Sequence, residues 1–161
     1  MDFEKARFNM VEQQIRPWEV LDQSVLDLLF KVKREDFVPA AYRAIAFTDM
    51  EIPLGHEQSM LSPKLEARLL QELAVKPADR VLEIGTGSGY LTALLARSGA
   101  HVTSIEYFQD FSAEAATKLA RASIYNVKLI IGDAAQFPAP HVTAGEKFDR
   151  SEERRVGKEC A

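Results

Sequence analysis

A glycine-rich segment at residues 81–90, VLEIGTGSGY, holds the residues with the clearest chemical potential in the chain. Gly85, Gly87 and Gly89 follow a short apolar run and precede a predicted helix, so a ligand can approach the backbone closely at the helix N-terminus. Their spacing is G-x-G-x-G, whereas a dinucleotide-binding turn has G-x-G-x-x-G. The predicted ligand-binding loop consists of Gly85, Thr86, Gly87, Ser88 and Gly89.

The acidic residue Glu83 lies two positions before the first glycine and narrows the class of ligand. A carboxylate there is unfavourable beside a pyrophosphate, but it suits a ligand that carries a sulfonium and an ammonium group. S-adenosylmethionine (SAM) carries both. For opposite charges a few ångströms apart and partly shielded from water, the attraction is on the order of 1–4 kcal/mol. The sequence therefore favours SAM as the cofactor.

Two further acidic residues stand where later predicted strands end. Glu106 closes the strand at residues 101–106, where a carboxylate can accept hydrogen bonds from both ribose hydroxyls of either SAM or NAD. Asp133, followed by Ala134, comes after the strand at residues 127–131 and can meet an adenine amino group, which favours SAM over NAD. Any one acid alone is better explained as a solvated loop carboxylate or a cap. Three at successive strand ends, beside a glycine turn, predict a SAM site.

The elements that would position these residues alternate between strand and helix. The predicted order is a strand at 81–84, a helix at 91–97, a strand at 101–106, a helix from about 111 to 123 and a strand at 127–131. Such alternation implies right-handed crossovers and a parallel sheet, so the predicted fold is α/β and doubly wound (Rossmann-like). The first strand of such a sheet is central. The second and third strands are expected on one side of it, and the other flank is expected to stay open.

The part of the chain before the sheet is predicted to be helical with irregular links, as far as about Pro63. Asp22 can cap a helix, and Ser62 with Pro63 can begin another. The apolar positions expected to face inward are Val25, Leu28, Leu29 and Val32 in the first helix and Leu65, Leu69, Leu70 and Leu73 in the second. We therefore expect a helical segment over residues 1–78 and the first half of a cofactor-binding sheet over residues 79–149.

The last residues do not fit this pattern. Residues 150–160 read RSEERRVGKEC, with no apolar period. The string looks like the conceptual translation of a common sequencing-adapter oligonucleotide, and the alternative is a charged, disordered C-terminal tail. It begins where a core strand is due. We therefore interpret residues 150–161 as a non-native tail and the domain as C-terminally truncated, with an open apolar strand edge that favours poor solubility or partial folding.

Composition sets the broad class of protein. The chain has 161 residues, a formal net charge of -4 and 47% hydrophobic residues, as is usual for one globular domain. The acidic balance argues against binding to nucleic acid or an anionic membrane, and no apolar stretch is long enough to span a bilayer. One cysteine and three histidines without ligand-like spacing argue against a metal site. A cytoplasmic protein is expected.

Two segments upstream of the glycine loop identify a family. They are MVEQQIRPWEVLDQSVLDLLFKVKREDFVP at residues 10–39 and IPLGHEQSMLSPKLEARLLQEL at residues 52–73. Together with VLEIGTGSGYLTALLA, they resemble the protein-L-isoaspartate O-methyltransferase family in sequence, order and spacing over essentially residues 1–149. The resemblance implies methyl transfer from SAM to the free α-carboxylate of isoaspartyl residues in damaged proteins, which begins their repair. It also makes residues 1–78 the substrate-side segment.

The implied reaction needs little from the protein's own acid–base groups. A carboxylate with a pKa near 4 is ionised at neutral pH, so no general base is required. The enzyme has to align the carboxylate oxygen with the methyl group and to exclude water. As a truncated domain, the chain by itself is expected to be inactive.

One segment departs from the family pattern. After Pro-x-Gly the family usually has Gln-Thr-Ile-Ser-x-Pro, and its serine is assigned to the active site; here residues 58–63 read QSMLSP. Ser59 matches the threonine, and Leu61 stands where the serine is expected. Ser62 can substitute for that serine, although a helix N-cap is its favoured role, and Glu57 replaces a usual glycine. The alternatives are therefore a methyltransferase with another acceptor, a SAM-binding protein without transferase activity and, more distantly, an NAD oxidoreductase.

Overall fold

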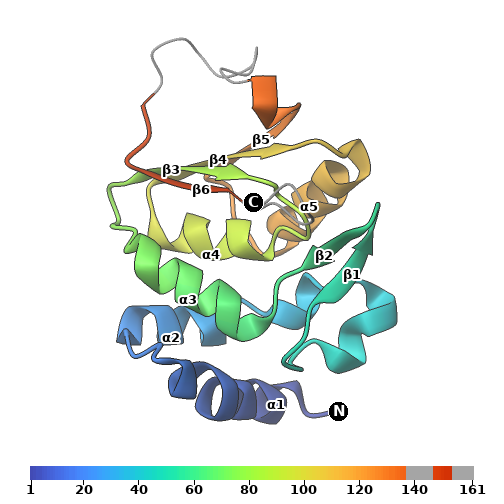
Figure 1. Ribbon diagram of the computed structural model, residues 1–161, viewed down its shortest axis with the longest axis vertical. Helices are drawn as coiled ribbons and strands as arrows, with labels where there is room; N and C mark the ends of the chain where they lie inside the picture. The colour runs from blue at the N-terminus through green and yellow to red at the C-terminus, as the bar shows by residue number, and fades with distance from the viewer. Residues whose placement is uncertain (137–146, 154–161) are drawn as a thin grey trace. The chain divides into compact units, whose positions relative to one another are not determined.

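The computed structural model describes residues 1–136 and 147–153, and the chain divides into two compact units, Met1–Ala74 and Val75–Ala161 (Figure 1). The second unit carries the glycine loop, and the first carries the segment at residues 58–63. Within the described ranges, no helix combines the length and the apolar character that crossing a bilayer requires.

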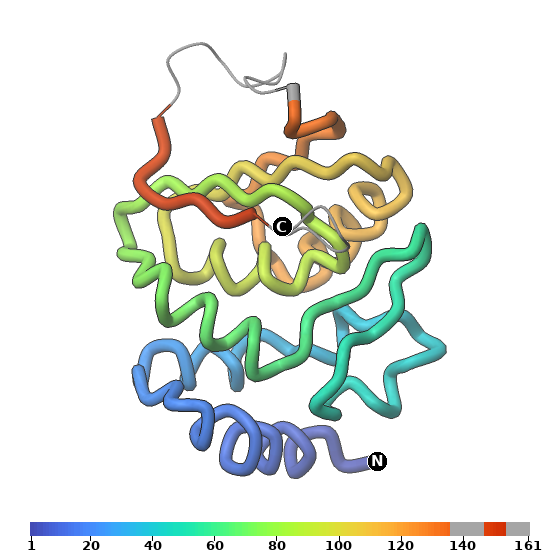
Figure 2. Tube along the Cα trace, in the orientation of Figure 1, coloured from blue at the N-terminus to red at the C-terminus, as the bar shows by residue number. Residues whose placement is uncertain are grey.

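The second unit is built on a four-stranded parallel sheet. β3 (Arg80–Ile84) pairs with β4 (His101–Glu106), and β4 pairs with β5 (Val127–Ile131). The chain trace passes from β3 through α4 (Tyr90–Ser98) to β4, and from β4 through α5 (Gln109–Arg121) to β5 (Figure 2). The strand order β5-β4-β3-β6 puts β3 inside the sheet. This arrangement confirms the predicted doubly wound α/β class.

The flank of β3 that was expected to stay open is paired. β6 (Arg150–Glu153) lies parallel to β3. Asp149 introduces this strand: its backbone N–H donates to the Arg80 carbonyl, and its side chain accepts from the Arg80 N–H, both at 2.8 Å. The prediction that the sheet ends with its third strand is therefore wrong, because strand pairing satisfies backbone N–H and C=O groups whatever the side chains are. Residues 154–161 of the predicted tail lie outside the described residues.

Local sequence explains where α4 begins and ends. The N–H of Tyr90 donates to Ser88 Oγ at 3.2 Å at the first turn. At the other end, the Gly99 N–H bonds to the Leu95 carbonyl at 2.9 Å. A Cβ on Gly99 would lie 2.9 Å from the Asp79 carbonyl oxygen, closer than a side chain tolerates. Between these ends most of α4 is buried, as expected of a helix that covers central strands.

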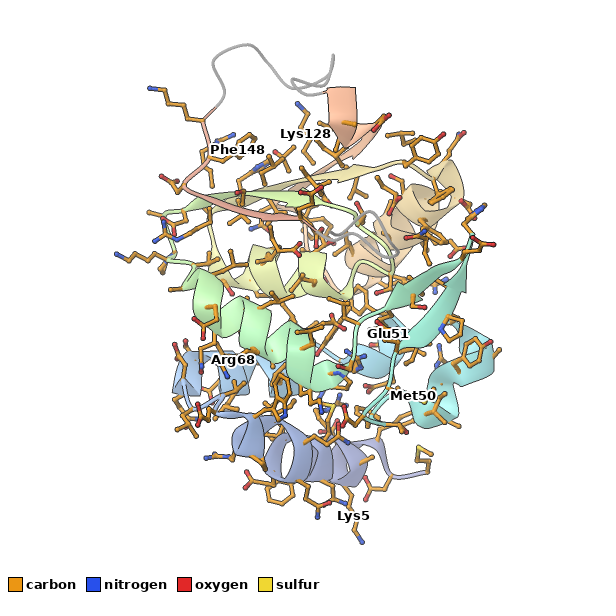
Figure 3. All side chains as sticks on the ribbon, in the orientation of Figure 1. Lys5, Met50, Glu51, Arg68, Lys128 and Phe148 are labelled. Atoms are coloured by element: carbon orange, nitrogen blue, oxygen red, sulfur yellow. The ribbon has the colours of Figure 1, made fainter. Side chains whose placement is uncertain are left out.

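The two faces of the sheet differ in character. One face carries an apolar cluster of Leu82, Ile105 and Ile130, against which Phe148 packs (Figure 3). The strand register places Glu83 opposite Ser104 on the other face, because side chains alternate along a strand. The second face therefore holds the polar groups on which the glycine loop depends.

The first unit consists of helices, short turns and one hairpin. Its helices and helical turns are α1 (Phe3–Met10), η1 (Val11–Ile15), η2 (Arg16–Trp18), α2 (Gln23–Lys31), η3 (Arg34–Asp36), η4 (Ala40–Ile45) and α3 (Pro63–Leu73). Asp22 caps α2 by accepting from the Ser24 N–H at 2.9 Å, and α3 begins at Pro63. Both predicted helix starts are confirmed.

Two features of this unit were not predicted. β1 (Ile52–Gly55) and β2 (Gln58–Met60) form an antiparallel hairpin within a stretch expected to be helical or irregular. In α3, Leu65 is 37% exposed, whereas Glu66 is buried. Leu70 is buried as predicted, and only Leu65 among the four leucines is exposed. Glu66 is inside because it pairs with the buried Arg34.

Two buried arginine–glutamate pairs link the elements of the first unit. Arg7 donates to both oxygens of Glu35, at 2.7 and 2.8 Å, and Arg34 donates to Glu66 at 2.9 Å. Both arginine side chains are fully buried. Since Arg34 and Glu35 are neighbours in η3, this single turn joins α1 to α3 through charge-assisted hydrogen bonds.

Removal of the Arg34 guanidinium should destabilise the first unit strongly. Arg34→Met is expected to lower the free energy of unfolding by about 3–5 kcal/mol, because it takes the arginine away from the buried Glu66 carboxylate. Urea unfolding followed by the fluorescence of Trp18 measures this loss. Arg16→Met, at an exposed pair with Glu12, is the control and should cost at most about 1 kcal/mol. Similar losses in both variants would contradict the role assigned to the buried pair.

The stability of this unit should also depend on acid pH. Burial raises the pKa of Glu35, but the hydrogen bonds and charge of Arg7, a backbone hydrogen bond and the charge of Lys33 together hold that pKa below its usual range. Hydrogen bonds from Arg7 and Lys33 lower the pKa of Glu4 to about 2. A carboxyl with a lowered folded-state pKa stabilises the fold above the unfolded value, near 4.5, and stops doing so as pH falls through the folded value.

We therefore expect the free energy of unfolding to fall between about pH 4.5 and pH 2. Glu35→Gln should make this fall shallower. Urea titrations at half-unit pH steps give the slopes. A slope for Glu35→Gln that is as steep as that of the unmodified chain would show that the Arg7–Glu35 pair does not carry the dependence.

Candidate functional site

The glycine loop between β3 and α4 has the backbone geometry that its sequence predicts. Gly85, Gly87 and Gly89 have φ angles of 97°, 54° and 86°. Residues with a Cβ are strained in this left-handed region, so the loop needs glycine at these positions. The Gly85 N–H donates to the Ile105 carbonyl at 2.8 Å, and the Gly89 N–H to the Thr86 carbonyl at 2.9 Å. The loop is thus tied both to β4 and to itself.

Glu106, at the end of β4, fixes the middle of this loop. Its Oε1 accepts from the Gly87 N–H at 2.8 Å, and its Oε2 accepts from the Phe108 N–H at 3.1 Å. Each carboxylate oxygen can accept more than one hydrogen bond, so acceptor capacity remains for two hydroxyl groups of a ligand. The carboxylate is 6% exposed and lies directly beside the glycine backbone. Glu106 can therefore organise the loop and meet a ribose at once.

Glu83 is placed differently from the sequence-based expectation of a ligand-facing carboxylate. Its side chain is fully buried, and Oε1 accepts from Ser104 Oγ at 2.6 Å and from Thr92 Oγ1. Ser104 in turn lies 2.6 Å from Thr86 Oγ1 in the glycine loop. The Glu83 carboxylate thus acts from beneath the loop, and these hydroxyls provide hydrogen bonds that a buried charge requires.

Sequence reasoning missed Ser104 and Thr92. Each is a small hydroxyl residue within a buried element, but so is Thr103, so the signal in the sequence is weak. Such residues are retained in a core where they satisfy another polar group. Periodicity alone could not have paired them with Glu83, because the pairing depends on the parallel register of β3 and β4.

The residues after β5 lie at the same edge of the sheet. The Gly132 N–H donates to the Glu106 carbonyl at 2.9 Å, which brings the end of β5 beside the end of β4. Asp133 is exposed, and its Oδ1 accepts from the Ala135 N–H at 2.9 Å. Ala134 packs against the apolar cluster of the sheet. The Asp133 carboxylate has a capping role here and still offers acceptor capacity to solvent.

One exposed aromatic residue also stands at this edge. Tyr107 follows Glu106, is 67% exposed, and its ring lies edge-on to Phe108 with 5.1 Å between centroids. Sequence reasoning did not select it. An exposed ring beside the Glu106 carboxylate can stack on a planar group.

In the first unit, the residues at the predicted acceptor segment lie on β2 and at the start of α3. Ser59 is half-buried and pairs across the hairpin with Pro53. Leu61 is half-buried, and its carbonyl accepts from Arg34 Nη2 at 2.9 Å. Ser62 occupies the N-cap position, but its side chain makes no capping hydrogen bond. Ser62 is thus the predicted N-cap residue, but it caps through its backbone, because its carbonyl accepts from the Glu66 N–H at 3.1 Å.

The hairpin turn bends at position 57, where the family resemblance implies a glycine. Gly55, His56 and Glu57 have φ angles of 104°, 51° and 59°. Glu57 thus adopts a left-handed conformation that glycine takes without strain, and its exposed carboxylate adds negative charge to the turn. Among the described residues, no group of three or more potential metal ligands comes together.

Comparison with known proteins identifies the family. The family model for protein-L-isoaspartate(D-aspartate) O-methyltransferase matches residues 5–142. A protein-L-isoaspartate O-methyltransferase of Methanoculleus marisnigri is 39% identical over 132 residues, which are 82% of this chain and 60% of that protein. One from Roseiflexus castenholzii is 40% identical over 136 residues, covering 84% and 62%. The chain thus spans about 60% of the length of these relatives.

Solved structures agree on the fold. A protein-L-isoaspartate O-methyltransferase superposes with a TM-score of 0.62 at 26% identity, over 81% of this chain and 42% of that one. A Plasmodium falciparum protein solved in complex with S-adenosyl-L-homocysteine gives 0.65 at 21% identity, over 84% and 65%. By the extent of its sequence match, this chain belongs to the protein-L-isoaspartate(D-aspartate) O-methyltransferase family.

Proposed function

We propose that this chain binds SAM and belongs to a protein that transfers its methyl group to the α-carboxylate of L-isoaspartyl residues in damaged proteins. The observation that carries the proposal is the Glu106 carboxylate, which holds the Gly87 N–H at the carboxyl end of the sheet. Membership of the family supports the choice of reaction.

The residues at this edge suit SAM in three respects. The positive-φ glycines leave room for close approach to the backbone, Glu106 has acceptor capacity for ribose hydroxyls, and the exposed Asp133 can accept from an adenine amino group. Glu83 is buried beneath the loop and supports it through Ser104 and Thr92. Thr86 and Ser88 are buried and support the loop through their hydroxyls.

When bound, SAM supplies an electrophilic methyl group on a sulfonium. An ionised carboxylate needs no proton removed, so the protein's own residues only have to bind and orient the acceptor and exclude water from it. Ser59 and Ser62 are the hydroxyl groups on the acceptor segment that could hold it. The Ser62 hydroxyl is available for this role, since it does not cap α3.

Two observations favour a second candidate, a methyltransferase for another acceptor. Leu61 can neither donate nor accept a side-chain hydrogen bond, and Glu57 places a negative charge on the hairpin turn that would repel an acceptor carboxylate. A SAM-binding protein without turnover is a third candidate. For each, the proposed setting is cytoplasmic, with no nucleic acid or membrane as partner.

Cofactor binding by the chain tests the first part of the proposal. Isothermal titration should detect SAM binding and no comparable NAD binding. Glu106→Gln is expected to weaken SAM roughly tenfold or more, because an amide nitrogen would face one of the two backbone N–H donors. Glu114→Gln, an exposed change of the same charge on α5, is the control. Equal affinities in both variants would contradict the role of Glu106.

Acceptor identity needs a matched pair of peptides, one isoaspartyl and one aspartyl. The whole protein is expected to transfer labelled methyl to the isoaspartyl peptide alone. Leu61→Ser restores a hydroxyl at the family position and should raise kcat/KM for that peptide by about tenfold. Methylation of neither peptide, with SAM still bound, would reject the isoaspartyl reaction and favour the other candidates.

A further inference from the structure

Two polar side chains on one face of β4 reach the glycine loop. Ser104 and Glu106 are two positions apart, so they point to the same side of the strand. Ser104 Oγ lies 2.6 Å from Thr86 Oγ1, and Glu106 Oε1 lies 2.8 Å from the Gly87 nitrogen. Consecutive loop residues are thus held by alternate residues of one strand.

The hydrogen bonds around Ser104 have a defined direction. Ser104 donates its single hydroxyl hydrogen to Glu83 Oε1 at 2.6 Å. The 2.6 Å contact between Ser104 and Thr86 must then take its hydrogen from Thr86. A directed chain therefore runs from Thr86 through Ser104 to Glu83. Thr92 on α4 donates to the same Glu83 oxygen, so both hydroxyl groups end on one buried carboxyl group.

This series of hydrogen bonds, called the relay below, runs from Thr86 through Ser104 to Glu83 and also affects the backbone of the loop. The Thr86 carbonyl accepts from the Gly89 N–H at 2.9 Å, and this bond closes the turn that starts α4. An orientation imposed on Thr86 through Ser104 is therefore passed on to Gly89. Glu106 fixes Gly87 between them.

We propose that Ser104 is a positioning residue for the cofactor: by orienting Thr86, it keeps the glycine loop in the conformation that receives SAM. This inference rests on the proposed function of the loop. On this inference Ser104 contributes to the affinity for SAM without having to contact SAM. Ser104 joins Thr86 to Glu83 because its hydroxyl oxygen both donates and accepts a hydrogen bond.

The neighbouring Thr103 provides a matched control. It is on the same strand and equally buried, but it points to the opposite face. Among the described residues, its hydroxyl has no hydrogen-bond partner. Thr103→Val therefore removes a buried hydroxyl from β4 without touching the relay. Asn126→Ala is a second control: it removes side-chain bonds to the Ala96 and Ala100 carbonyls and lowers stability away from the loop.

The experiment measures SAM affinity by calorimetry, well below the melting temperature, for Ser104→Ala, Thr86→Val and both changes together. Each single variant should weaken SAM roughly tenfold, and the double variant should lose much less than the product of the two, because both ends of one bond are then removed. Thr103→Val and Asn126→Ala should stay within about twofold of the unmodified chain, although Asn126→Ala melts earlier.

Amide hydrogen exchange of Gly87 and Gly89 tests the relay without a ligand. Exchange should be faster in Ser104→Ala and unchanged in Thr103→Val. Unchanged exchange and unchanged SAM affinity in Ser104→Ala would overturn the inference. So would a loss of affinity that Asn126→Ala reproduces, because general destabilisation would then explain it. If the unmodified chain fails to bind SAM, the proposed function is wrong, and the exchange rates alone decide whether Ser104 positions the loop.

Discussion

The burial of the Glu83 carboxylate is the constraint on which the organisation of the second unit depends. An ionised carboxylate inside a protein is costly unless hydrogen bonds replace its water. Here the replacement comes from a hydroxyl on the next strand and another on the following helix, Ser104 and Thr92. These hydrogen bonds link β3 to β4 and to α4. Ser104 also ties the glycine loop to the sheet through Thr86, so a core interaction and a ligand site share the same atoms.

In the first unit, buried ionisable side chains are paired with groups of opposite charge. Arg7 and Arg34 are fully buried, and each meets a glutamate. Arg34 also donates to the Ala46 and Leu61 carbonyls, at 2.7 and 2.9 Å. A single side chain therefore fixes three separate parts of the chain, including the backbone just before Ser62. In both units, buried charge specifies how irregular segments are held.

Regular elements could be predicted from the sequence, and the buried polar contacts could not. Alternating apolar strands, the caps at Asp22 and Ser62–Pro63 and the glycine pattern gave the α/β order and the loop. The β1–β2 hairpin escaped because its strands are short and its turn uses His56 and Glu57 in a left-handed conformation that their residue types do not favour. β6 was not predicted because its sequence is charged, and a charged segment can still pair through its backbone. The burial of Glu66 and Glu83 depends on partners distant in sequence, which no local period reveals.

The central claim is that the carboxyl edge of this sheet binds SAM through the glycine loop. Its most direct test is a titration of the isotopically labelled chain with SAM, followed by the amide resonances of Gly85, Gly87 and Gly89. Saturable shifts at these glycines and at Phe108, whose amide bonds to Glu106, are predicted with SAM and not with NAD. Absence of these shifts with SAM, or the same shifts with NAD, would contradict the claim.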